Sequence, residues 1–200
     1  MTSDHLGLHA AIGVLLLATT VVVIRFKFAS GMRKSPPRSE YEPRFLSTAL
    51  GMLATLLGVV VLVALLQPNA FPAASINLPI PLRFAGITVA GIGLLLMYWS
   101  LISLGRNFSG SSGTHSDAQL CNAGPYKFVR HPYYTATLLL SSGLSIAVSS
   151  WVLFVGGLLL FGLLSIRSRA EEQELARRFP DTYPAMQQST GRFIPKLLKR

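Results

Sequence analysis

The 200-residue chain contains one cysteine, Cys121, and few charged residues for its length. A single thiol excludes an intramolecular disulfide and a metal site built from several cysteines. The histidines stand at positions 5, 9, 115 and 131, which is not the spacing of a metal-ligand motif. We therefore expect no bound metal.

Charged residues make up 13% of the chain and hydrophobic residues half of it, a balance outside that of soluble domains. Three segments lack Asp, Glu, Lys and Arg and are each long enough to cross a bilayer as a helix: Leu6–Ile24, Phe45–Leu66 and Phe84–Leu104. A fourth uncharged stretch, Tyr134–Ile166, is too long for one crossing and is broken by two serines at 149 and 150. It predicts a hairpin of two helices of about 16 residues each, short for a full crossing.

The fold class expected is therefore an all-α integral membrane protein with about five transmembrane helices. The last two form the short helical hairpin, and a cytoplasmic C-terminal helix follows them. No Lys or Arg precedes the first apolar segment, so we expect a retained helix and not a cleaved signal peptide. Small residues four apart, Ala54/Gly58 and Gly86/Ala90, predict sites of close helix packing.

The scarcity of ionisable groups inside the apolar segments disfavours a transporter or channel, because ion and proton pathways need such groups at membrane depth. Only His9 lies within a predicted span.

The basic residues follow the predicted topology. Seventeen of the 18 fall in residues 25–44, in residues 105–133 or in the tail from 167, and Arg83 is the exception. The positive-inside rule makes that side cytoplasmic, with the N-terminus outside and the C-terminus inside, in the plasma (inner) membrane if the source is bacterial. The net charge of +10 is then explained by topology and anionic headgroups, and we expect no nucleic-acid partner.

A dense polar and aromatic cluster lies between two apolar runs. It comprises Gly124-Pro125-Tyr126 and Arg130-His131-Pro132-Tyr133-Tyr134. Beside a bilayer such groups cost free energy unless they have partners or a ligand, which favours a functional site. The alternative is an interfacial belt in which Arg130 and His131 meet lipid headgroups.

Strong helix formers continue beyond the last apolar run until Pro180, so we expect the helix to leave the membrane. Arg167 and Glu171 lie four residues apart on one face of it. An ordinary exposed ion pair is the alternative, but at the membrane boundary the pair could bind a zwitterionic or polyhydroxylated cofactor.

The order and spacing of several motifs resemble a known family. They are Leu104-Gly105-Arg106-Asn107-Phe108-Ser109, Gln119-Leu120, Gly124-Pro125-Tyr126, Arg130-His131-Pro132-x-Tyr134, Glu171-Glu172, Phe179, Tyr183 and Thr190-x-Arg192-Phe193-Ile194-Pro195. Over residues 101–195 the chain is similar to the integral-membrane methyltransferases typified by isoprenylcysteine carboxyl methyltransferase, with phospholipid N-methyltransferases as relatives. One departure is Ala118, where the family frequently has histidine.

The resemblance implies S-adenosyl-L-methionine as cofactor and a lipophilic or prenylated substrate reached from membrane lipids. The apolar segments predict residues 1–104 as a three-helix membrane region, and the resemblance implies residues 105–200 as a methyltransferase-like catalytic half; together they form one structural unit. Arg167 matches the arginine placed near a substrate carboxylate, and Glu172 is the alternative to Glu171 as cofactor partner. The implied cofactor contacts are Leu120, Tyr126, Arg130, His131, Pro132, Tyr133, Tyr134, Glu171 and Glu172.

A carboxylate acceptor needs no catalytic base, because it is ionised at neutral pH. An amine acceptor must lose a proton, for which His131 or a glutamate is the candidate base. A sterol-reductase-like enzyme using NADPH is the third reading. It is disfavoured by Ala170-Glu171-Glu172, where those reductases carry Arg-Asp-Glu.

Overall fold

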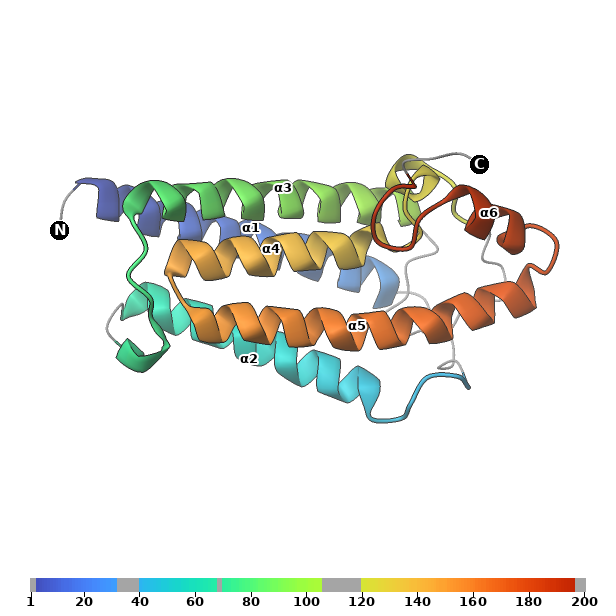
Figure 1. Ribbon diagram of the computed structural model, residues 1–200, viewed down its shortest axis with the longest axis horizontal. Helices are drawn as coiled ribbons and strands as arrows, with labels where there is room; N and C mark the ends of the chain where they lie inside the picture. Colours follow the sequence, from blue (N-terminus) through green and yellow to red (C-terminus); the bar gives the residue numbers. More distant parts are fainter. Residues whose placement is uncertain (1–2, 32–39, 68–69, 106–119, 197–200) are drawn as a thin grey trace.

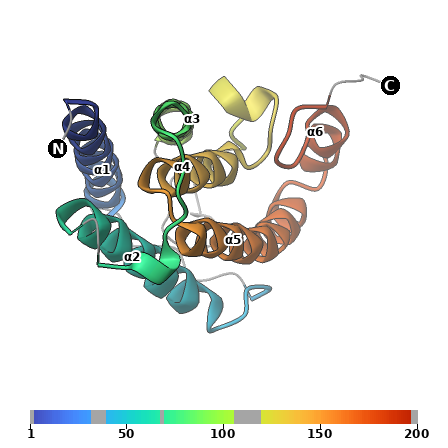
Figure 2. The same ribbon diagram turned by 60° about the vertical axis from the view of Figure 1, so that its left-hand side comes forward.

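The computed structural model of the protein describes residues 3–31, 40–67, 70–105 and 120–196, and these residues contain six α-helices and two short 3₁₀ helices. Five long helices run side by side along the long axis (Figures 1 and 2). No strand occurs in these described ranges, where the only ladder contacts are isolated bridges. The elements are α1 Ser3–Gly31, α2 Leu46–Leu66, η1 Pro72–Ala74, α3 Ile80–Leu104, η3 Gly124–Lys127, α4 Pro132–Val148, α5 Trp151–Arg178 and α6 Tyr183–Ser189.

Among the residues that the structure describes, four helices are long and apolar enough to cross a membrane, which confirms an all-α membrane fold. They are Leu6–Phe26, Leu46–Leu66, Ile80–Leu104 and Trp151–Arg178. The remaining long helix, α4, has 17 residues, so a count of five crossings stays a prediction.

The predicted hairpin forms, but its second arm is not short. Helix α4 ends before Ser149, and α5 runs for 28 residues from Trp151 to Arg178. The expected continuation of the last apolar helix beyond the apolar run is confirmed, because no proline interrupts the chain until Pro180. The short α6, which follows that proline, was not predicted.

The break between α4 and α5 is a two-residue turn. Ser149 adopts the left-handed conformation, φ 61° and ψ 44°. The Ser149 N–H donates to Ile146 O and the Ser150 N–H to Ser145 O, the paired contacts of a Schellman motif. The Ser150 side chain then caps α5 by accepting from the Leu153 N–H at 3.4 Å. The connection therefore allows antiparallel helices without a long loop.

Glycines bring the backbones of α3 and α4 into contact. A Cβ on Gly93 would lie 2.6 Å from Leu140 N, and one on Gly86 would lie 2.7 Å from Ala147 N. A Cβ on Gly143 would collide with the backbone of Ala90. The packing predicted for Gly86/Ala90 is confirmed.

The Ala54/Gly58 prediction is wrong. Both residues are exposed, and a Cβ on Gly58 would meet nothing within 4 Å. They lie on the outward face of α2, whereas Leu46 and Leu50 on its inner face pack against α5.

The functional candidates gather at one end of the helices, opposite the N-terminus. Figure 1 shows the ends of α3 and α5, the start of α4 and the short α6 meeting there.

Candidate functional site

The loop before α4 is held against the end of α3. Gly124 has a φ of 55°, and a Cβ there would collide with Ser103 Oγ and lie 2.9 Å from Trp99 Nε1. The Cys121 thiol donates to Ser103 O at 3.3 Å. Burial raises the pKa of that thiol, which keeps it protonated at neutral pH. These contacts fix the direction in which the following residues enter α4.

The C-terminal segment pairs with this loop. The Gly191 N–H donates to Phe128 O at 3.2 Å, and the Arg130 N–H donates to Gly191 O at 2.9 Å. The His131 N–H donates to Arg192 O at 3.0 Å. Backbone pairing thus brings residues after α6 beside the start of α4.

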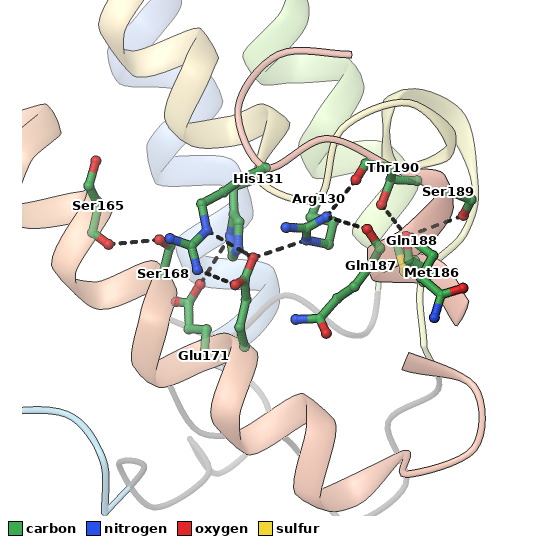
Figure 3. A network of polar contacts seen from close by, with 12 residues as sticks. Arg130, His131, Ser165, Ser168, Glu171, Met186, Gln187, Gln188, Ser189 and Thr190 are labelled. Atoms are coloured by element: carbon green, nitrogen blue, oxygen red, sulfur yellow. Dashed lines mark hydrogen bonds and ion pairs between the residues drawn. The ribbon is translucent and has the colours of Figure 1, made fainter. Parts of the chain in front are cut away.

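Glu172 is the centre of a buried ion network, and two of its partners, Arg130 and His131, are labelled in Figure 3. Its Oε1 accepts from Arg130 Nε at 3.0 Å and from Arg192 Nε at 3.1 Å. The same oxygen lies 3.2 Å from His131 Nε2. Arg192 Nη2 donates to Oε2, which makes this contact bidentate. Three cationic or polar partners therefore converge on one carboxylate whose side chain is only 8% exposed.

Arg130 ties the network to α6. Its Nη1 donates to Thr190 O at 2.6 Å and to Gln187 O at 3.3 Å, which satisfies the C-terminal carbonyls of that short helix. Figure 3 shows Arg130 reaching between these residues and α5. The contact with Glu172 also raises the pKa of Arg192 above its ordinary value.

Glu171 belongs to a second, more accessible cluster. Its Oε1 accepts from the Tyr134 hydroxyl at 2.7 Å and from Arg167 Nε at 3.1 Å, and its Oε2 lies 3.5 Å from His131 Nδ1. The Glu171 side chain is 21% exposed, compared with 8% for Glu172. Neighbouring glutamates in the sequence thus have different surroundings.

His131 lies between the two carboxylates. One ring nitrogen faces Glu171 and the other faces Glu172, while the ring stacks on Tyr134 at 5.3 Å and an interplanar angle of 11°. Pro132 is buried at the first position of α4, where its missing N–H costs no hydrogen bond. Tyr133 is half-buried and packs edge-on against Tyr134.

An apolar cluster borders the polar groups. Buried Tyr126, Tyr183 and Met186 form it, with half-buried Leu120 packed against them. Burial raises the pKa of Tyr126 and of Tyr183, so both remain neutral phenols. The Tyr183 hydroxyl has no hydrogen-bond partner within the described part of the chain.

The structure brings six of the predicted site residues into the connected polar network: Arg130, His131, Tyr134, Arg167, Glu171 and Glu172. Leu120 and Tyr126 lie in the apolar cluster, and Pro132 and Tyr133 support the start of α4. The predictions at Arg106, Asn107, Phe108, Ser109, Ala118 and Gln119 fall outside the described residues.

Two residues that sequence reasoning missed contact these networks. The sequence analysis noted Arg192 only as part of a motif. Glu172 had no predicted ionic partner there, so Arg192 could have been matched to it. Glu42 lies 4.0 Å from Arg167 Nε, and no signal in the basic segment around it pointed to this contact.

The arrangement combines carboxylates, guanidinium groups and aromatic rings at the ends of apolar helices. This combination of groups suits a ligand that carries both positive charge and hydroxyl or carboxylate groups.

Part of the chain is similar to a known protein family. Residues 86–177 match the model of the isoprenylcysteine carboxyl methyltransferase (ICMT) family. No curated protein matches the chain. The match confirms the resemblance to membrane methyltransferases. Its range includes the site residues of α4 and α5, but neither Glu42 nor the segment after α6.

Proposed function

We infer from the match to the isoprenylcysteine carboxyl methyltransferase family that this protein transfers a methyl group from S-adenosyl-L-methionine to a lipophilic acceptor at the membrane surface. The observation that carries the proposal is the cluster around Glu171. One carboxylate there contacts an arginine, a tyrosine hydroxyl and a histidine, all within the matched range.

The side chains of the Glu171 cluster and the aromatic rings beside it suit this cofactor. S-adenosyl-L-methionine supplies an activated methyl group on a positively charged sulfur. Glu171 would accept from its ribose hydroxyls or its amine. The rings of Tyr126 and Tyr134 suit a cation near their faces.

Glu172 has a different role in this proposal. Its oxygens already accept from Arg130 and Arg192 and contact His131. We assign it to holding the site together, and we assign the cofactor contact to Glu171, whose side chain is the more exposed of the two.

We propose a carboxylate as the acceptor. Arg167 would pair with it and orient the attacking oxygen, because a guanidinium binds a carboxylate with two parallel hydrogen bonds. The lipid part of the acceptor would enter sideways between apolar helices. A phospholipid amine would arrive protonated and be repelled by the same guanidinium.

The proposal also covers the orientation of the chain in the membrane and its division into two regions. The site end would face the cytoplasm, where the cofactor is made, with the N-terminus outside. Residues 1–104 would form the membrane region and residues 105–200 the catalytic half of one structural unit.

The test is a binding and activity experiment on the purified protein in detergent. We expect calorimetric binding of S-adenosylhomocysteine, no binding of NADPH, and methyl transfer to farnesylated N-acetylcysteine. Transfer to phosphatidylethanolamine alone would replace the carboxylate acceptor with an amine. Binding of NADPH without S-adenosylhomocysteine would refute the methyltransferase proposal in favour of a reductase.

A further inference from the structure

A carboxylate from the N-terminal region reaches the proposed acceptor arginine. Glu42 lies in the connection between α1 and α2, and its side chain is fully buried. Its Oε1 is 4.0 Å from Arg167 Nε and accepts from the Ser47 hydroxyl at 2.8 Å. Residue 42 lies outside the family-matched range, so the match assigns it no role.

The start of α2 is built to hold Glu42 in place. Leu46 is fully buried and, together with Leu50, packs against Tyr134, Leu160 and Leu164. The Leu46 N–H donates to Pro43 O at 3.0 Å, which closes the turn directly after Glu42. Glu42 therefore directly precedes α2, a helix whose start packs against both α4 and α5.

Burial makes the contact energetically necessary. A buried carboxylate costs several kcal/mol unless a cation and hydrogen bonds compensate for the lost water. Arg167 supplies positive charge and Ser47 supplies a hydrogen bond. Glu40, only two residues earlier, is exposed. The burial of Glu42 is thus a property of this position and is not shared by the neighbouring glutamate.

We propose that Glu42 is a positioning residue for Arg167. Arg167 Nε lies 3.1 Å from Glu171 Oε1 and 4.0 Å from Glu42 Oε1. Carboxylates from two different parts of the chain thus fix the orientation of the Arg167 guanidinium. A two-pronged contact with an acceptor carboxylate depends on that orientation. The inference rests on the proposed role of Arg167, and it makes the N-terminal helices part of acceptor recognition.

The experiment compares Glu42→Gln with the exposed control Glu40→Gln, using farnesylated N-acetylcysteine as the carboxylate acceptor. For Glu42→Gln we expect KM for the acceptor to rise about tenfold, the effect of losing one charge-assisted contact. The Kd for S-adenosylhomocysteine should stay within about twofold of wild type. Ser47→Ala should shift KM in the same direction by less, and Glu40→Gln should behave as wild type.

A second measurement separates failure of this inference from failure of the proposed function. Thermal unfolding in detergent is recorded for Glu42→Gln, Arg167→Gln and the double variant. Non-additive midpoints support the contact even if farnesylated N-acetylcysteine is not methylated. Additive midpoints together with an unchanged KM would overturn the inference. An equal loss of cofactor and acceptor affinity in Glu42→Gln would also overturn it, because it would indicate general damage to the site.

Discussion

Replacing Glu172 by glutamine should unfold the site, whereas the same change at Glu171 should only weaken cofactor binding. Glu172→Gln removes the negative charge that faces Arg130, His131 and Arg192 but keeps the size of the side chain. The arginines then remain beside one another without a counter-charge. The C-terminal segment, which Arg192 ties to α5, loses this ion pair.

The magnitude follows from the burial of the network. Removing one partner of a buried ion network costs about 3–5 kcal/mol. Arg192 is 33% exposed and can regain water, while Arg130 is 12% exposed and cannot. We therefore expect the lower part of that range, about 3 kcal/mol. Glu171→Gln loses charge-assisted contacts at a more accessible position, and we expect about 1.5–3 kcal/mol in cofactor affinity, or roughly ten- to a hundredfold.

The assay measures both variants in the same detergent. Thermal unfolding reports stability, and calorimetric titration with S-adenosylhomocysteine reports affinity. Glu172→Gln should show the lowered midpoint, and Glu171→Gln should show weak binding with a midpoint close to wild type. An unchanged midpoint for Glu172→Gln, or unchanged affinity for Glu171→Gln, would refute the division of roles between the two glutamates.

Three further predictions concern other parts of the molecule. Arg167→Lys keeps the charge but loses the planar geometry, so turnover of a carboxylate acceptor should fall at least about tenfold with cofactor affinity little changed. Intact activity in a methyl-transfer assay would leave Arg167 as a membrane-edge anchor. Ser149→Gly relieves the left-handed backbone and removes a buried hydroxyl that lacks a partner among the described residues, so stability by thermal unfolding should rise by about 1 kcal/mol, and a decrease would contradict this account. A reporter fused after Arg200 should be cytoplasmic and one inserted near Ala73 external, and the reverse result would separate the site from its cofactor.

The sequence by itself determined the features that depend on local pattern. Uncharged segments of membrane-crossing length predicted α1, α2 and α3, because their apolar composition needs no information about neighbours. The serines at 149 and 150 and the proline at 180 placed helix ends, since backbone conformation at those positions is decided within a few residues. The i,i+4 spacing of Arg167 and Glu171 likewise predicted a contact that α5 makes.

Only the tertiary structure decided which of several equivalent patterns is used. Gly86/Ala90 packs against α4 whereas Ala54/Gly58 faces outward, although both have the same spacing. Glu171 and Glu172 are adjacent and identical, yet one lies beside Arg167 and the other receives Arg192 from beyond α6. The contact of Glu42 with Arg167 joins segments that are distant in the chain. Local periodicity predicts which face of a helix a residue occupies, but the packing of the helices decides which partner it meets there. The burial that makes these charges important for stability exists only in the packed state.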